Sequence, residues 1–313
     1  PRSTPKPSSA ASDVYKRQAL GNSVNIPAVK MLYLNGVEKM VELANKMGIN
    51  FGDPSNYGLS LTLGGGEVKM TEMATAFGVF ANSGVRVDLN PILEIKNYQG
   101  RVLEKFAPQE GERVLPMEVS YLISHILLDN NARSAVFGPS SYLVIPGHAV
   151  SVKTGTTNDR RDNWTIGYTP SFLAAVWSGN NDNSPTLTFG ATGAAPIWNK
   201  IMRKVLEDQP DEWPSIPENI VGKQVCVLSG KLPNPDAPCQ TRYEYFIKDN
   251  EPQEIETLTR LVEIDKTTGQ LATEETPPEN RELQEHQVIE DALGTLYCLD
   301  CPPPSQPVTI KYP

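Results

Sequence analysis

The most informative segment of this chain reads Val150-Ser151-Val152-Lys153-Thr154-Gly155-Thr156-Thr157-Asn158-Asp159. Apolar and polar residues alternate at its start, which is typical of a β-strand with one buried face. Because Gly155 has no β-carbon, the backbone of a ligand could lie along the strand edge. With a lysine and two hydroxyl groups beside it, this edge suits a peptide that carries a carboxylate and binds as an added strand. A strand that simply runs into a turn is the alternative interpretation.

Two more apolar runs follow this strand after short gaps. They are Trp164–Tyr168 and Phe172–Trp177, and the gaps leave no room for a crossover helix. The three runs therefore predict an antiparallel meander. A helix is predicted from about Pro196, because apolar residues then repeat on one helical face. Together with helices before the strand, the pattern predicts an α+β fold in which an antiparallel sheet packs with helices.

The region before the strand contains several helix signals. Asn25 is predicted to cap a helix that has Pro27 in its first turn and is broken by Gly36. Further helices are predicted over Val37–Met47 with Gly48 as C-cap, over Met70–Asn82 with Thr71 as N-cap, and over Val119–Asn130. The glycine-rich segment Leu61–Glu67 lacks the spacing of a phosphate-binding loop, so we predict a tight turn there.

Length and charge limit the classes of function. The chain has 313 residues, enough for one large domain and a smaller one, and a formal net charge of −9. This acidic balance argues against a nucleic-acid-binding protein, which needs basic patches. The sequence contains no apolar run of membrane-spanning length and no signal-peptide pattern. We predict a domain over residues 19–207 and a proline-rich, cysteine-containing extension over residues 208–313.

All the cysteines lie in this extension, as Cys226, Cys239, Cys298 and Cys301. An even, clustered set predicts disulfides and an oxidising setting outside the cytoplasm. A local disulfide between Cys226 and Cys239 is reasonable, because a Gly/Pro/Asn turn region separates them. Zinc is the alternative for four cysteines, but their spacing is irregular and only His286 is nearby. A short hairpin is also expected over Leu261–Gln270.

The first residues do not resemble a protein domain. Residues 8–18 resemble the in-frame translation of a sequencing adapter, and residues 1–4 fit the primer just upstream. We therefore predict that residues 1–18 are a read-through artefact and exclude them from the fold. Ser3 and Lys6 form a Ser-x-x-Lys in this segment, but the intervening proline would be costly in the helix turn that such a motif requires. We interpret Ser3 and Lys6 as a decoy.

Five segments in a fixed order resemble one known family. They are Ala19–Val29, Leu63–Val68, Lys153–Asp159, Trp164–Pro170 and Val176–Asp182. Together they are similar to the transpeptidase domain of class A penicillin-binding proteins, over about residues 19–207. The resemblance implies the serine β-lactamase/D,D-transpeptidase fold. It also identifies Ser23 and Asn25 as the Ser-x-Asn element of the family, and Lys153-Thr154-Gly155 as its Lys-Thr-Gly element.

The resemblance implies an acyl transfer, with no cofactor and no metal. In this family a serine of a Ser-x-x-Lys motif attacks the penultimate D-Ala carbonyl of a peptidoglycan stem peptide, and the acyl group then passes to an amine on a neighbouring stem. By the same resemblance, Ser23 and Lys153 complete a proton path to the leaving amine. Asn25 would hydrogen-bond the substrate amide.

The resemblance assigns substrate binding to the strand after Lys153. Thr154 and Thr156, with Gly155 and Thr157 beside them, would hold the terminal carboxylate of the stem peptide or the carboxylate of a β-lactam. A backbone N–H near Thr156 would supply half of an oxyanion hole. The expected partners are therefore stem peptides that end in D-Ala-D-Ala, and β-lactams, but no nucleic acid.

The chain departs from the family pattern at the nucleophile. The Ser-x-x-Lys of this family lies well before Ser-x-Asn, and residues 19–22 contain no such motif. We therefore expect an inactive fragment of an active parent. The missing N-terminal part of that parent would carry the nucleophile, a glycosyltransferase domain and a membrane anchor. The resemblance implies a location on the extracytoplasmic face of the bacterial cell membrane, in the periplasm or at the outer surface.

Other functions fit parts of the same pattern. A serine β-lactamase or a D,D-carboxypeptidase would share the fold, although the asparagine-rich stretch after Lys-Thr-Gly and the long extension fit bifunctional synthases better. A non-catalytic penicillin-binding sensor or a cell-wall-binding module is the alternative from a different class.

Overall fold

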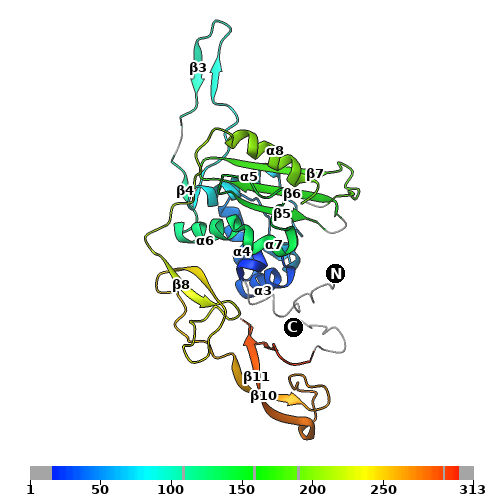
Figure 1. Cartoon of the computed structure of the whole chain (residues 1–313). Helices are drawn as coiled ribbons and strands as arrows, with labels where there is room; N and C mark the ends of the chain where they lie inside the picture. Colours follow the sequence, from blue (N-terminus) through cyan, green and yellow to red (C-terminus); the bar gives the residue numbers. More distant parts are fainter. Residues whose placement is uncertain (1–15, 108–109, 158–159, 189–190, 292, 303–313) are drawn as a thin grey trace. The chain divides into compact units, whose positions relative to one another are not determined.

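The computed structural model describes residues 16–107, 110–157, 160–188, 191–291 and 293–302. These residues divide into two compact units, a first unit of residues 17–220 and a second unit that begins at Val221 (Figure 1). No helix within the described ranges is long and apolar enough to cross a membrane.

The first unit is built on a three-stranded antiparallel sheet. Its strands are β5 (Ser151–Thr156), β6 (Asp162–Tyr168) and β7 (Leu173–Gly179), in the order β5-β6-β7. In the register of this sheet Lys153 lies opposite Ile166. The meander predicted from the sequence is confirmed. Strand β5 lies at the edge of the sheet, where one side of its backbone faces away from β6.

Helices cover both faces of this sheet. Helix α8 (Ala194–Leu206) packs on one face, where Trp198 and Met202 are fully buried with Val152 of β5. On the other face the Ser151 hydroxyl donates to the Ser124 carbonyl of α6 at 2.8 Å. Figure 1 shows α8 above the strands and α6 below them. The alternation of β5 therefore separates an apolar face from a polar one, as the sequence predicts.

The helices before the sheet differ from prediction mainly at their ends. The structure has α2 (Lys16–Gly21), α3 (Asn25–Asn35), α4 (Val37–Lys46), the short 3₁₀ helices η1 (Pro54–Asn56) and η2 (Leu59–Leu63), and α5 (Met70–Ala81). Helix α3 ends at Gly36, which has a φ of 89°. Asn25 is not its N-cap, because that position is held by Val24 with no side-chain bond. The cap of α5 is Lys69, not Thr71, since its N–H donates to the Glu72 carboxylate at 3.3 Å.

One predicted helix is present, and a helix that was not predicted follows it. The segment predicted over Val119–Asn130 is α6 (Met117–Leu128), and α7 (Asn130–Phe137) follows it directly. Asp129 separates them, because its Oδ1 accepts from the Ala132 N–H at 3.1 Å and so caps α7. The predicted helix is thus found with both ends shifted by two residues, and α7 is a further helix.

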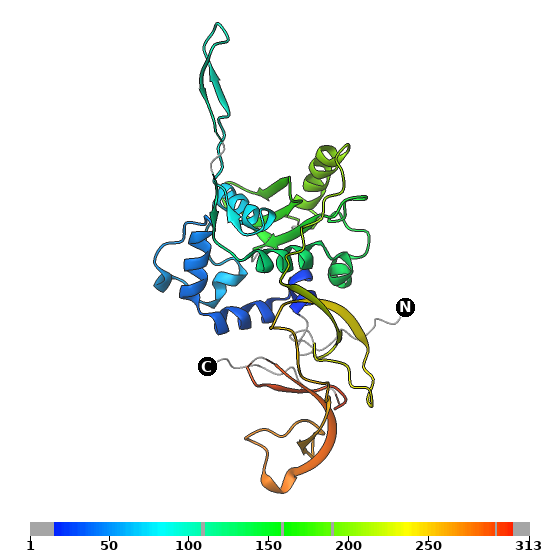
Figure 2. The ribbon, with the colours of Figure 1, turned by 90° about the vertical axis from the view of Figure 1, so that its left-hand side faces the viewer.

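The first unit also contains a β-hairpin that was not predicted from the sequence. Strand β1 (Val85–Arg86) pairs with β4 (Glu112–Arg113), and between them β2 (Glu94–Lys96) pairs with β3 (Val102–Lys105). Figures 1 and 2 both show the β2–β3 hairpin standing away from the rest of its unit. Its apolar residues, such as Tyr98 with 95% exposure, contribute nothing to the core.

The second unit is made of two small sheets. Strands β8 (Ile220–Cys226) and β9 (Thr241–Ile247) form one sheet, and β10 (Thr259–Asp265), β11 (Arg281–Glu290) and β12 (Leu296–Cys298) form the other, with η4 (Pro278–Asn280) before β11. The predicted Cys226–Cys239 disulfide is present, and Cys298 pairs with Cys301. The hairpin predicted over Leu261–Gln270 is only partly right. Its turn closes at Gly269, but the main partner of β10 is β11.

Candidate active site

Ser23 and Lys153 are 130 positions apart in the sequence and in contact in the structure. The Lys153 ammonium, on the edge strand β5, donates a hydrogen bond to the Ser23 hydroxyl and another to the Thr154 carbonyl at 2.8 Å. Ser23 lies between α2 and α3 with a φ of 57°, in the left-handed region that a serine rarely occupies. Such conformations often persist at functional positions, where the surroundings enforce them. The structure therefore brings together two of the predicted catalytic residues.

The surroundings of Lys153 weaken its hold on a proton. Burial above all, and then the charge of the nearby Arg133 guanidinium, lowers the pKa of Lys153 to about 8. Arg133 is itself buried and donates to the carbonyls of Leu127 at 2.6 Å and Val152 at 3.4 Å. Burial lowers the pKa of Arg133 to about 10, so this group stays charged at neutral pH. A lysine with a pKa near 8 can exchange protons at physiological pH.

Neighbouring residues hold the Ser23 turn in place. The Asn22 amide donates to the Ala132 carbonyl at 2.7 Å and accepts from the Val136 N–H at 3.1 Å, which fastens the turn to α7. On α2, the buried Arg17 forms an ion pair with Asp129 at 3.3 Å. Helix α2 begins inside the segment interpreted as an artefact. The boundary at residue 18 therefore remains a prediction, and Ser3 and Lys6 lie outside the described residues.

Asn25 is exposed at the first turn of α3, two residues beyond Ser23. The contact of its amide with the substrate stays a prediction. His125, on α6, contacts the Arg17 side chain and lies against the Tyr121 ring, so it is a packed histidine.

The threonines that follow Lys153 differ in exposure and in hydrogen bonding. Thr154 and Thr156 alternate with Gly155, and Thr156 is exposed at the strand end. The Thr157 hydroxyl is used within the turn, since it donates to Asp162 Oδ2 at 3.1 Å and accepts from the Asp162 N–H at 2.9 Å. The roles of Thr154, Thr156 and Thr157 in carboxylate binding stay predictions.

Gly155 is not required by the fold. A β-carbon there would come no closer than 3.4 Å to its nearest neighbour, the Trp164 side chain, and the φ of Gly155 is not in the left-handed region. That Gly155 keeps the strand edge open for a ligand stays a prediction. Gly64, in the glycine-rich turn, borders the same end of the strand near Thr157.

Sequence reasoning missed three supporting residues. Asn22 and Arg133 act through contacts between separate segments, and Asp162 acts through a turn with Thr157, and neither spacing nor periodicity shows such contacts. A polar residue next to Ser23 was the only available signal for Asn22. A metal is not suggested here: among the described residues, the one set of clustered His, Cys and acidic ligands is that of His286, Cys298, Asp300 and Cys301 in the second unit.

Two protein-family models together match most of the chain. The model of the penicillin binding protein transpeptidase domain covers residues 6–203. The chain belongs to this family. The model of the penicillin-binding protein 1A C-terminal domain covers residues 216–261, within the predicted extension. The predicted resemblance and the predicted fold class are both confirmed.

Curated relatives agree with this assignment. Penicillin-binding protein 1A of Clostridium botulinum is 31% identical over 292 residues, which cover 88% of this chain and 34% of that protein. The protein of the same name from Aquifex aeolicus is 33% identical over 248 residues, or 77% of this chain and 32% of that protein. The chain thus spans about a third of the length of the curated relatives it matches.

Solved structures show the same fold. Penicillin-binding protein 1A from Haemophilus influenzae has a TM-score of 0.65 at 26% identity, over 77% of this chain and 41% of that one. PonA1 from Mycobacterium tuberculosis in complex with penicillin V has a TM-score of 0.52 at 20% identity, over 64% of this chain and 61% of that one, and indicates the fold alone.

Proposed function

We propose that this chain is the substrate-binding part of a D,D-transpeptidase that cross-links peptidoglycan through an acyl-serine intermediate. The observation that carries the proposal is the hydrogen bond from Lys153 to Ser23 beside an open edge strand, in a chain of the penicillin-binding transpeptidase family. The relatives of this chain that carry the name penicillin-binding protein 1A support the same activity.

The first role of the site is to move a proton. When a serine attacks the penultimate D-Ala carbonyl, the C–N bond to the terminal D-Ala breaks and the leaving nitrogen needs a proton. Ser23 can give its hydroxyl proton to that nitrogen and take one from the Lys153 ammonium. A pKa of about 8 makes Lys153 an easier donor than an ordinary lysine at neutral pH.

The second role is to align the substrate. The stem peptide would lie along the free edge of β5, with its carboxylate at the hydroxyls of Thr154 and Thr156 and near the positive charge of Lys153. Asn25 would hydrogen-bond the substrate amide. A backbone N–H near Thr156 would stabilise the tetrahedral oxyanion, a contribution typically worth about 3 kcal/mol. A β-lactam would bind by the same groups.

The nucleophile belongs to a Ser-x-x-Lys motif, and the only such motif in the chain is Ser3–Lys6. We propose that this motif is a decoy and that the chain by itself is not acylated. The active parent would be anchored to the membrane, would act on its extracytoplasmic face, and would also carry a glycosyltransferase. The disulfides of the second unit are compatible with that oxidising location.

The test is the rate of acylation by a fluorescent penicillin in a protein that carries the family's Ser-x-x-Lys upstream of Ala19. Lys153→Ala should slow acylation about 100-fold or more, because general acid–base groups contribute at that level. Lys200→Ala is the matched control, since this exposed lysine lies on α8 away from the sheet edge. Equal rates for the two variants would contradict the assigned role of Lys153.

A further inference from the structure

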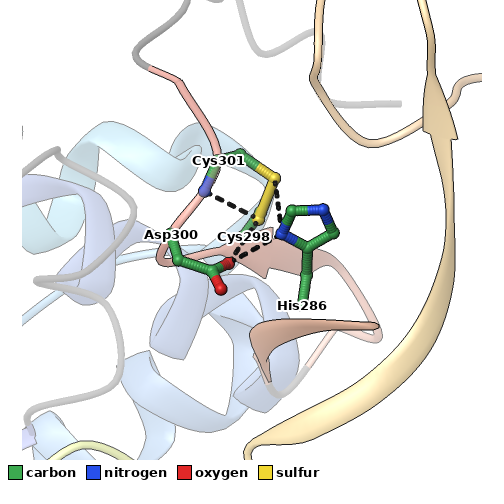
Figure 3. Close-up of side chains that lie close together, drawn as sticks. All are labelled: His286, Cys298, Asp300 and Cys301. Carbon is green, nitrogen blue, oxygen red and sulfur yellow. Dashed lines mark hydrogen bonds and ion pairs between the residues drawn. A yellow bond between two sulfur atoms is a disulfide. The ribbon is translucent and has the colours of Figure 1, made fainter. Parts of the chain in front are cut away.

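Four side chains with metal-ligand atoms meet in the second unit, outside the candidate active site (Figure 3). His286 comes from β11, Cys298 ends β12, and Asp300 and Cys301 follow in the next loop. One ligand atom from each residue lies within 4.8 Å of all the others. Cys298 and Cys301 are joined by a disulfide, with their Cα atoms 5.5 Å apart.

The sheet holds this cluster together independently of the disulfide. Val288 of β11 is paired with Cys298, and the Leu299 N–H donates to the Gln287 carbonyl at 2.8 Å. The Gln287 N–H in turn donates to the Asp300 carboxylate at 3.1 Å. Both cysteines also pack against the apolar cluster that contains Val288. The two sulfur atoms would therefore remain neighbours after reduction of the bond.

His286 is oriented as a ligand would be. Its Nε2 lies 3.1 Å from Gln284 Oε1, and its Nδ1 lies 3.0 Å from Asp300 Oδ1. A neutral imidazole has one N–H, so it can donate to only one of these two acceptors. When Nε2 donates to Gln284, the lone pair of Nδ1 faces a carboxylate oxygen, and a cation between them would stabilise both. Metal-binding histidines commonly donate their second ring N–H in this way.

The sulfur atoms fit the same cation. The Cys301 N–H donates to Cys298 Sγ at 3.1 Å, a contact that favours a thiolate. Cys298 Sγ lies 3.3 Å from Asp300 Oδ1, and Cys301 Sγ lies 3.9 Å from His286 Nδ1. Zinc bonds of about 2.0–2.3 Å in a tetrahedron separate ligand atoms by roughly 3.3–3.8 Å. Three of the six pairs of ligand atoms are therefore already near tetrahedral spacing, and the two bonded sulfurs must move apart.

We propose that His286, Cys298, Asp300 and Cys301 form a zinc site that opens when the Cys298–Cys301 disulfide is reduced. A dithiol reductant would break the S–S bond, give two thiols and itself become a disulfide. Zinc would then displace the two thiol protons to solvent and form two Zn–S bonds, with Nδ1 and the carboxylate completing the tetrahedron. Two cysteines and one histidine suit this borderline-soft ion.

The test is zinc binding by the full chain, compared between its oxidised form and a dithiol-reduced form from which the dithiol has been removed. Reduced wild type should bind a single zinc ion in competition with a chromogenic chelator, and cobalt in its place should give a thiolate charge-transfer band. Cys298→Ser should abolish both signals. The double variant Cys226→Ser/Cys239→Ser is the matched control and should keep them, because no His or Asp ligand set surrounds that pair among the described residues.

Two further variants separate ligation from folding. His286→Ala and Gln284→Leu leave both cysteines in place, and each should weaken zinc binding about tenfold or more while the oxidised chain keeps its circular dichroism. The proposal is overturned if the reduced chain binds no zinc, if Cys298→Ser binds as well as wild type, or if the oxidised chain binds as tightly as the reduced one.

Discussion

Lys153 is the residue whose chemistry depends most on its surroundings. Its ammonium donates to the Ser23 hydroxyl, and the charge of the buried Arg133 acts on it. We predict that NMR titration of its side chain gives a midpoint near 8. An ordinary lysine midpoint would show that burial and Arg133 do not act on it as described.

This lowered pKa has a consequence for stability. Between pH 8 and the ordinary lysine pKa of 10.5, the unfolded chain binds more protons at this position than the folded chain. Holding the charged lysine in the folded chain therefore costs stability below this window. The free energy of unfolding rises with pH through the window, because this cost disappears as Lys153 loses its proton. The effect is at most about 3 kcal/mol. Denaturant unfolding of wild type and Lys153→Met across this range should show the rise only in wild type.

Arg133 acts on Lys153 through its charge and on the fold through its hydrogen bonds. Arg133→Met should raise the pKa of Lys153 and lower the free energy of unfolding by about 1–3 kcal/mol, because the Leu127 and Val152 carbonyls lose their donor. Arg133→Lys keeps the charge and should leave the pKa nearer to 8. A pKa that is unchanged in Arg133→Met would contradict the electrostatic effect of Arg133 on Lys153.

Some residues of the candidate site could be predicted from the sequence, and others could not. The resemblance to the family was enough to pair Ser23 with Lys153, because both lie in short, ordered motifs. Asn22 and Arg133 could not be predicted, since their partners are backbone carbonyls of α6, α7 and β5, more than a hundred residues away for Asn22. Their roles depend on how helices end and pack, which short-range patterns do not show.

Two glycines of the central sheet differ in whether the fold has room for a side chain. At Gly167 of β6 a β-carbon would lie 2.3 Å from the Trp198 ring of α8, whereas at Gly155 of β5 it would have room. Gly167→Ala should therefore destabilise the first unit by about 1–3 kcal/mol. Gly155→Ala should fold normally but slow acylation in a protein with the upstream nucleophile. Thermal unfolding and penicillin labelling of both variants test this contrast.

The strands and helices that could be predicted from the sequence are those with a clear pattern of apolar residues. Strands β5, β6 and β7 alternate or run apolar between turns, and α8 repeats its apolar residues at helical spacing, so their positions follow from the sequence. The β2–β3 hairpin could not be found in this way, because its apolar residues are exposed and form no core. Helix α7 was not predicted, since its start depends on one side-chain cap at Asp129.

At the scale of the whole molecule, the chain has two compact units with different sources of stability. The first buries a core around Trp198 and β5, whereas the second has small sheets fastened by disulfides. Loss of the Cys226–Cys239 bond, which closes 13 residues, should cost about 2–4 kcal/mol. In Cys226→Ser/Cys239→Ser, hydrogen exchange should become faster in β8 and β9 and stay unchanged in β5–β7. Equal acceleration in both units would contradict their separate stabilisation.

The assignment of Ser23 as a proton relay, and not as the nucleophile, can be tested on this chain directly. The measurement is intact-mass spectrometry with peptide mapping after incubation with penicillin G. We expect no adduct on this chain, and a single adduct on the Ser-x-x-Lys serine when the upstream segment of the family is present. An adduct on Ser23 would contradict the proposed relay, and an adduct on Ser3 would show that its motif is not a decoy.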